Sequence, residues 1–184
     1  MPDECINIIR IQGQMSVIQN VYEQAARKAE TLNNPSVPLA LLEAMVPKPP
    51  ELIPNSIDWN LENWGTKWEA HESQIEYVIN KDAQAELKGS FITAWTPPIT
   101  AYTIFTQNNP GLWLYAEYYQ LVEGLAGVFR QDFGAKSFRI PEDLLQRYFE
   151  DEESESDINI DEEDFWNEIK IMVDATIRSK DTCP

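Results

Sequence analysis

The sequence predicts an α+β fold in which helices cover one face of an antiparallel sheet, followed by an acidic helical extension. Three observations lead to this prediction. Short β-branched or aromatic runs alternate with segments of helical periodicity along residues 1–136. Four of the six tryptophans lie between Trp59 and Trp95, where a buried cluster would tie the middle of the chain together. After Gly134 the composition changes, and residues 150–164 contain no Lys or Arg.

The N-terminal part predicts a strand, a helix and a connector. Residues 5–12 are largely β-branched and end at Gly13, which is typical of a buried strand. Ser16 can cap the helix that follows, whose apolar residues recur at helical spacing until the break at 33–35. The proline-rich stretch 38–54 predicts a short apolar turn and a stiff connector packed on the domain, with a plain linker as the alternative.

The middle of the chain predicts a short helix and a set of strands. Residues 57–64 can form two helical turns that stop at Gly65. We expect a strand at 67–71, and residues 74–79 are either a second strand or an extension of its hairpin. Residues 87–95 form the clearest strand of this region, which Pro97 and Pro98 end.

The following residues predict a helix to position 108 and then strands at 112–121 and 124–133, joined by a short turn. The resulting order is strand, helix, strand, strand, helix, strand, strand. Two strand–helix–strand units in one layer form the ferredoxin-like plan. We therefore expect a ferredoxin-like domain at residues 1–136. The extension, residues 137–184, should hold a short helix at 141–149 and an amphipathic helix after the acidic residues 161–164.

The length, composition and net charge of the chain limit the classes of function. With 184 residues and 43% hydrophobic content, the chain can bury a core without disulfides or metals. Its net charge of -17 opposes direct binding to nucleic acid or to anionic membranes, and favours basic partners or simple solubility. Cys5 and Cys183 are expected as free thiols in a reducing cytoplasm. We see no signal peptide and nothing near the ~20 apolar residues of a membrane span, so we expect a cytoplasmic protein.

Five features follow one another along residues 1–134. They are Met1-Pro2-x-x-Cys5-x-Asn7, the apolar run that ends in Gly13, Asn63-Trp64-Gly65-Thr66-Lys67-Trp68, Thr93-Ala94-Trp95-x-Pro97-Pro98, and Glu117-Tyr118 followed by Gly124-x-Ala126-Gly127. Together they resemble the YubB-like ferredoxin-like domain found in proteins of phages and plasmids. The resemblance implies the ferredoxin-like fold and an origin in a mobile genetic element, and it implies no catalytic residue. The residues that could belong to a shared pocket are Trp59, Asn63, Trp64, Gly65, Lys67, Trp68, Trp95, Pro97, Pro98, Glu117 and Gly127.

The tryptophan cluster and the single histidine have two interpretations each. The indole rings could form a pocket that stacks a base, a sugar or a side chain, or they could simply cover the sheet and lock the turn at Gly65. His71 with Glu69, Glu72 and Glu117 could form an acid–base or metal constellation, or His71 could be a solvated surface residue. The chain lacks a glycine-rich phosphate loop, a serine nucleophile elbow and a Cys–His signature, so no catalytic residue is assigned.

The acidic run also has alternatives. It is either a solvated loop or a mimic of a phosphate backbone that binds a basic groove. The positions 157, 159, 161 and 168 have the ligand spacing of a calcium-binding loop, but Glu162 replaces the glycine of its sharp turn, so we predict no cofactor or metal. The expected partner-binding residues are Glu150, Asp151, Glu152, Glu153, Glu155, Asp157, Asp161, Glu162, Glu163 and Asp164.

These observations lead to three hypotheses. The first is a non-enzymatic phage or plasmid accessory protein that binds a host protein, for example a basic or nucleic-acid-handling one, through its acidic residues. The second is a small-ligand-binding protein or enzyme that uses the tryptophan cluster and His71. The third is a self-associating structural module, because the amphipathic tail helix could pair with a copy of itself.

Overall fold

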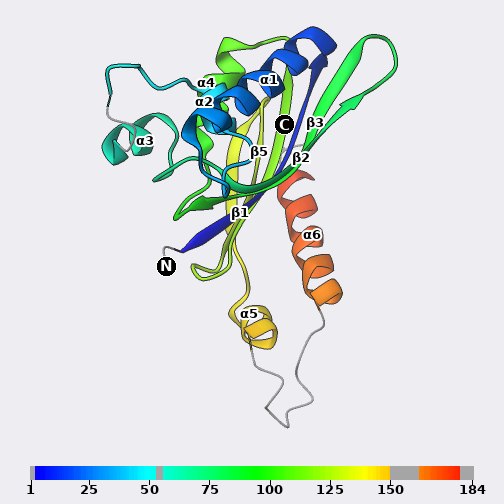
Figure 1. Cartoon of the computed structure of the whole chain (residues 1–184). Helices are drawn as coiled ribbons and strands as arrows, with labels where there is room; N and C mark the ends of the chain where they lie inside the picture. Colours follow the sequence, from blue (N-terminus) through cyan, green and yellow to red (C-terminus); the bar gives the residue numbers. More distant parts are fainter. Residues whose placement is uncertain (1–2, 53–55, 150–161, 179–184) are drawn as a thin grey trace.

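The computed structural model describes residues 3–52, 56–149 and 162–178. Its centre is a six-stranded sheet with the order β2-β3-β1-β4-β5-β6, in which all neighbouring strands are antiparallel (Figure 1). The strands are β1 (Glu4–Gln14), β2 (His71–Ile79), β3 (Gln84–Ala94), β4 (Trp113–Gln120), β5 (Leu125–Arg130) and β6 (Gly134–Arg139). The fold is therefore α+β, as the sequence predicts.

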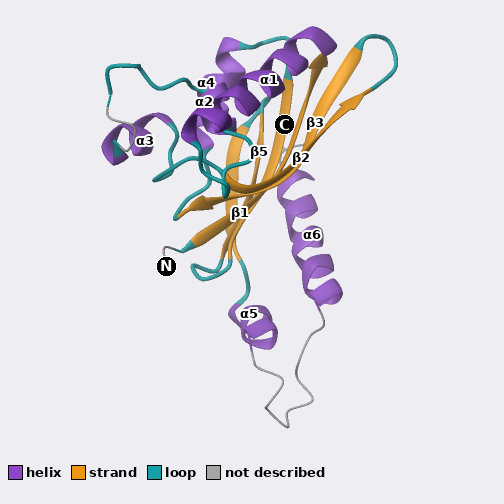
Figure 2. Ribbon diagram, in the orientation of Figure 1, coloured by secondary structure: helices purple, strands orange, loops and turns teal. Residues whose placement is uncertain are grey.

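The helices cover both faces of this sheet (Figure 2). Their bounds are α1 (Met15–Leu32), α2 (Leu41–Met45), α3 (Ile57–Asn63), α4 (Ile99–Asn108), α5 (Glu142–Phe149) and α6 (Glu162–Arg178). Helices α1, α2 and α4 lie on one face, and α6 runs along the other. Of the helices in the described ranges, none combines the length and the hydropathy that a membrane crossing requires.

Two apolar cores result from the alternation of side chains along the strands. In β1, Ile9 and Ile11 point toward α1 and are almost fully buried in the larger core. In β4, Tyr119 points to the opposite face, where it packs in a second core with Phe165 and Ile169 of α6. The buried residues of the second core all lie between Tyr119 and Val173, and Ile6 of β1 packs at its edge. The second core therefore covers only part of that face.

Most of the expected elements are confirmed, with shifts of a few residues at their ends. The expected strands near 5–12, 74–79, 87–95, 112–121 and 124–133 correspond to β1, β2, β3, β4 and β5. The expected helices near 57–64, 99–108 and 141–149 correspond to α3, α4 and α5. The amphipathic helix of the extension is α6, and its apolar face lies on the sheet.

Two expectations differ from the structure. The strand expected at 67–71 is wrong, because residues 64–70 form turns whose backbone is held by side chains of α3 and of the loop itself. Strand β6 was not expected, since none of its residues is β-branched. The domain boundary expected between residues 136 and 137 falls inside β6, so the sheet continues into the segment that was assigned to the extension.

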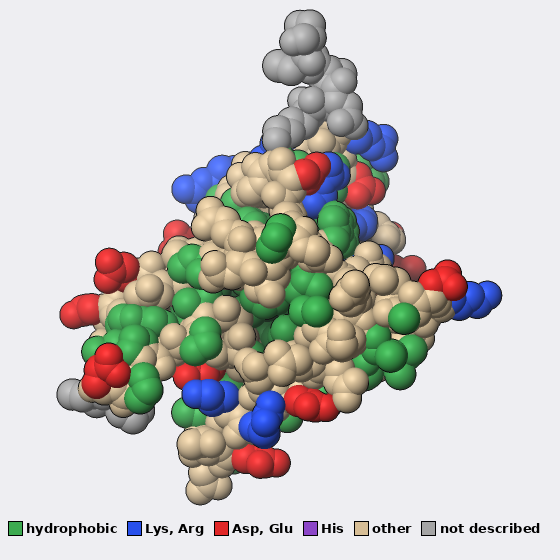
Figure 3. Space-filling view, turned by 90° about the horizontal axis from the view of Figure 1, so that it is seen from above, with side chains coloured by type: hydrophobic (Ala, Val, Ile, Leu, Met, Phe, Trp, Pro, Cys, Tyr) green, Lys and Arg blue, Asp and Glu red, His purple; other side chains and the backbone are tan. Residues whose placement is uncertain are grey.

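On the face shown in Figure 3, Asp and Glu side chains of the described residues are scattered along the rim, and Lys and Arg side chains lie between them. This face therefore carries no single acidic patch.

Candidate functional site

The tryptophans of the middle region form two pairs rather than one cluster. Trp59 and Trp64 meet edge to face, with ring centroids 5.5 Å apart. Trp64 is buried, and its indole N–H donates to the carbonyl of Val46 at 2.9 Å. Trp68 and Trp95 instead share a contact with Lys67, whose Nζ is 4.8 Å and 4.4 Å from their ring centroids.

Polar side chains lock the turn between these pairs. Asn63 Nδ2 donates to the carbonyl of Trp59 at 3.0 Å, as expected for a short polar residue beside a glycine turn. Thr66 Oγ1 donates to the carbonyl of Ala94 at 2.7 Å and thus fixes the turn to the end of β3. Gly65 has φ of +82°, and a Cβ there would lie 3.0 Å from Thr100 Oγ1. These residues of the resemblance therefore have a structural role.

The remaining residues of the resemblance lie at packing positions as well. Pro97 and Pro98 are buried immediately before α4. A Cβ at Gly127 would lie 2.4 Å from the carbonyl oxygen of Lys136 and from the ring of Tyr118. Gly127 therefore permits the close pairing of β5 with β6.

A hollow of about 900 Å³ lies beside Trp64 and Trp68. Its walls come from the C-terminal half of α1, from α2, from the connector 46–52 and from the segment 60–71. We call it the α2 hollow. Seven of its sixteen lining residues are apolar, among them Leu32, Pro49, Pro50, Trp64 and Trp68, and the other nine are polar or charged. Small-molecule sites usually combine apolar walls with placed polar groups, and here the indole and proline side chains supply the apolar walls.

The floor of the α2 hollow contains Glu69, whose carboxylate is buried. It accepts three backbone N–H groups, from Leu42 at 2.7 Å, Glu43 at 2.9 Å and Ala70 at 2.9 Å. Burial raises the pKa of this carboxyl to about 7, although the three N–H donors counteract part of the rise. Glu69 thus fastens α2 to the segment that carries Trp68 and His71, and holds the hollow open between them.

Two acceptors at the wall of the α2 hollow have no partner. Asn60 is 3% exposed, and its Nδ2 donates to the carbonyl of Lys67 at 2.7 Å, whereas its Oδ1 accepts no hydrogen bond. His71 Nδ1 is also buried and unpaired, and it is an acceptor when the ring carries its proton on Nε2. A buried polar atom without a partner costs about 1–3 kcal/mol. Both atoms have almost no accessible surface, so a ligand in the hollow donates to them only after the covering side chains move aside.

The charged groups around the α2 hollow nearly balance. Lys28 Nζ lies 3.1 Å from Glu43 Oε1. Desolvation lowers the pKa of Lys48, although the carboxylates of Glu43 and Glu69 oppose this shift. The Nζ of Lys48 lies 4.8 Å from the centroid of the Trp64 ring. Two cations beside two carboxyl groups favour a ligand without net charge.

The acid–base constellation expected around His71 is brought together only in part. Glu69 and His71 line the same hollow, because residues two apart in an extended segment point to the same side. Glu72 is exposed with φ of +50°, and its N–H donates to the carbonyl of Ser36. Glu117 lies on the opposite face of the sheet, and Trp95 lines a different, smaller depression.

Glu117 forms a second buried carboxylate site, under α6. It accepts hydrogen bonds from Tyr115 Oη at 2.5 Å and from Tyr119 Oη, and Lys170 Nζ of α6 lies 2.5 Å from its Oε1. Burial alone would raise the pKa of Glu117, but the donors Lys170, Tyr115 and Tyr119 outweigh burial and lower it below its ordinary value. Sequence reasoning missed Lys170, since nothing local indicates a partner 53 positions away.

Most of the predicted acidic residues lie outside the described residues. This applies to residues 150–161, and so to three of the four positions with calcium-loop spacing. Glu162, Glu163 and Asp164 form the exposed first turn of α6. In the described part of the chain, no three His, Cys, Asp or Glu residues are grouped so that they could hold a metal ion.

Comparison with known proteins adds no relative: no family model, no curated protein and no solved structure matches the chain.

Proposed function

We propose that the protein binds a small, planar, uncharged ligand in the α2 hollow, through a hydrogen bond that the ligand donates to Asn60 Oδ1. The observation that carries this proposal is the buried Oδ1 without a partner at the wall of the α2 hollow. The second unpaired acceptor, His71 Nδ1, lines the same hollow. Ligands with an aromatic or heterocyclic body fit best, because indole and proline side chains form the apolar walls.

Benzamide is a suitable probe, because it is planar and uncharged and carries an N–H donor. Methyl benzoate has a similar size and shape but no donor. We expect benzamide to bind with a dissociation constant of about 1 mM, which is ordinary for a ligand of this size, and methyl benzoate to bind at least tenfold more weakly. Both constants can be measured by ligand-observed NMR titration.

Trp68→Leu tests the location of the site, and Trp113→Leu is its matched control. The two residues are 37% and 39% exposed, but Trp113 lies on the opposite face of the sheet. We expect Trp68→Leu to weaken benzamide binding at least fivefold and Trp113→Leu to leave it unchanged. Equal affinity for benzamide and methyl benzoate, or equal effects of the two substitutions, would contradict the proposal.

A second candidate function is the binding of a basic host protein through residues 150–164. This proposal is supported by ten acidic and no basic side chains in that segment, and by the exposed first turn of α6. The triple change of Glu150, Asp151 and Glu152 to Lys should abolish capture of the partner from host lysate. The control carries the same reversal at the exposed Glu30, Glu62 and Glu123. Unchanged capture by the first variant would refute this candidate.

We further propose that residues 1–134 belong to the YubB-like ferredoxin-like family of phage and plasmid proteins, acting in the host cytoplasm. The motifs quoted above support this proposal. It is also supported by the order β2-β3-β1-β4 within the sheet, with α1 between β1 and β2 in sequence and α4 between β3 and β4. The alternative of a self-associating module is tested by light scattering of the purified protein, in which a monomer's mass at all concentrations would exclude it.

A further inference from the structure

The face of the sheet that carries α6 is covered only in part. Among the described residues, the main strand contacts of helix α6 are with β5 and β6. Ile6 of β1 packs at the edge of the α6 core, and no described helix packs on β2 and β3 from this side. The open part is concave and is bounded by α6 and by the edge strand β2. We call it the β-face trough, and the residues on which the argument rests are Ile8, Arg10, Lys88, Trp113, Tyr115 and Lys170.

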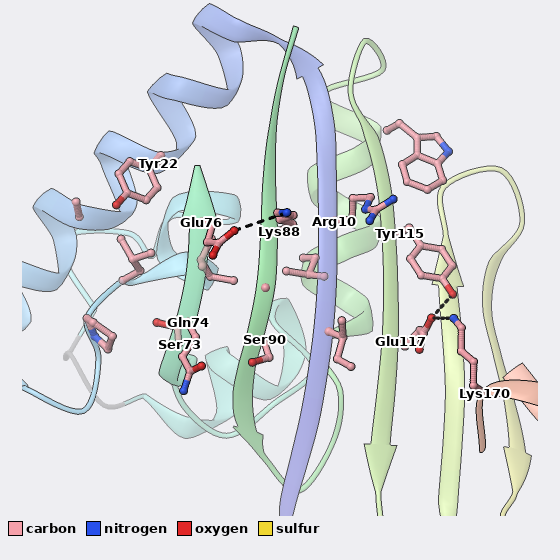
Figure 4. Close-up of a pocket in the computed structure, with 18 residues that line it drawn as sticks. Arg10, Tyr22, Ser73, Gln74, Glu76, Lys88, Ser90, Tyr115, Glu117 and Lys170 are labelled. Carbon is pink, nitrogen blue, oxygen red and sulfur yellow. Dashed lines mark hydrogen bonds and ion pairs between the residues drawn. The ribbon is translucent and has the colours of Figure 1, made fainter. Parts of the chain in front are cut away.

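Cations gather in the β-face trough. Strand register places Arg10 of β1 directly between Lys88 of β3 and Tyr115 of β4, and Lys170 reaches the same surface from α6 (Figure 4). The side chains of Arg10, Lys88 and Lys170 are 53%, 44% and 52% exposed. On the other side of Tyr115, its cross-strand partner is Arg130 of β5, so Lys88, Arg10, Tyr115 and Arg130 form one row across four strands.

Carboxylates also face the trough, but two of them lie beneath the cations. Glu86 and Glu117, the partners of Arg10 and Lys170, have side chains that are only 10% and 7% exposed. Glu76, the partner of Lys88, is 72% exposed, and Asp174 lies 3.8 Å from Lys170. Asp132 pairs with Arg130. The buried carboxylates hold Arg10 and Lys170 in place, and the side chains of Arg10, Lys88 and Lys170 remain about half exposed.

Aromatic rings lie next to these cations. Trp113 and Tyr115 are stacked, with centroids 5.9 Å apart and ring planes 2° from parallel. Trp113 is 39% exposed, and Ile8 beside this pair is 43% exposed. Exposed flat rings beside a row of cations are the elements with which proteins bind single strands, because bases stack on the rings and phosphates meet the cations.

We propose that the β-face trough binds single-stranded nucleic acid, with a base stacked on Trp113 and the backbone phosphates on Arg10, Lys88 and Lys170. The net charge of -17 opposes phosphate binding in general, so the proposal rests on the exposed rings and on the half-exposed cations beside them.

The test uses a fluorescein-labelled oligothymidylate of twelve nucleotides and fluorescence anisotropy with the full chain. We expect binding at micromolar protein in about 50 mM salt, with an affinity that falls steeply as salt increases. Trp113→Leu should weaken binding about tenfold through the lost stacking. The double change Arg10→Gln and Lys88→Gln should also reduce the slope of log affinity against log salt by about 1 to 1.5.

Trp68→Leu is the matched control, because Trp68 has a similar exposure on the opposite face of the sheet, and this variant should bind the oligonucleotide like the unchanged protein. Thermal unfolding of each variant shows whether it is folded. If Trp113→Leu does not fold, the double variant Arg10→Gln and Lys88→Gln still tests the proposal. The proposal is overturned by absence of binding at about 50 mM salt, or by equal loss in the Trp68 and Trp113 variants. A third outcome would also overturn the proposal. If a decaglutamate peptide displaces the labelled oligonucleotide as well as unlabelled oligothymidylate does, the trough binds acidic proteins instead.

Discussion

Glu69 and Glu117 are both buried glutamates, but their surroundings shift their pKa values in opposite directions. Glu69 accepts only backbone N–H groups and has no cation in hydrogen-bond contact, so burial dominates and its pKa rises to about 7. Glu117 is bonded to an ammonium and two phenol groups, and these lower its pKa despite burial. The comparison shows that burial alone does not decide the ionisation of a carboxyl group, whereas the charge of its donors does.

The two sites also differ in what they hold together. The partners of Glu69 come from α2 and from its own neighbour, so it shapes the wall of the α2 hollow. The partner of Glu117 is Lys170 of α6, so this pair fixes a helix to the sheet and sets the boundary of the β-face trough.

The largest effect is expected from Glu69→Ala. It leaves three backbone N–H groups without acceptors, and we expect a loss of about 3–5 kcal/mol in the free energy of unfolding. Chemical denaturation at pH 6 measures this loss, with the exposed Glu72→Ala as control, which should change stability by less than about 0.5 kcal/mol. If both substitutions have the same small effect, Glu69 does not hold the hollow together.

The pH dependence of stability should separate the two glutamates. Since the pKa of Glu69 rises from 4.5 to about 7 on folding, the folded protein binds more protons in that range, and the contribution of Glu69 falls as pH rises through it. The change amounts to about 3 kcal/mol. The pKa of Glu117 is lowered, so its contribution is present above 4.5 and is lost as the pH falls below that value.

Glutamine substitutions check these signs. Denaturation profiles from pH 3 to pH 8 should become flatter above pH 4.5 in Glu69→Gln and flatter on the acid side in Glu117→Gln. Identical profiles for the two variants would mean that the two carboxyl groups do not differ as described.

A smaller effect is expected from Lys170→Met, because Glu117 keeps the hydrogen bonds from Tyr115 and Tyr119. We expect a loss of about 1–3 kcal/mol, with faster amide exchange in α6 than in the rest of the chain. The exposed Lys81→Met is the control and should change neither quantity. Unaltered exchange in α6 would show that Lys170 does not fix this helix to the sheet.

Local patterns were sufficient for most of the sheet and helices. The β-branched run at 5–12 predicts β1 because strand propensity and burial agree there. The pattern failed at 67–71, where Trp68 and Ala70 alternate with polar residues as in a strand, but side-chain hydrogen bonds from Asn60 and Thr66 hold the backbone in turns. It missed β6, which forms by pairing with β5 rather than by its own propensity.

The candidate sites were only partly predictable. Glu69 and His71 could be placed together, because their spacing of two puts both on one side of an extended segment. The unpaired acceptor of Asn60 could not, since it depends on how α3 packs on the loop that follows it. The row formed by Lys88, Arg10 and Tyr115 could not either, since it depends on strand order and register. The functional sites therefore depend on long-range contacts that a sequence pattern does not contain.

The most direct test of the account is a ¹H–¹⁵N spectrum of the indole N–H groups, in which the six tryptophans report on both sites at once. We predict that benzamide shifts the signals of Trp64 and Trp68 and leaves that of Trp113 in place, whereas oligothymidylate shifts Trp113 and leaves the other two. Both probes shifting the same indole signals, or neither probe shifting any, would contradict the account.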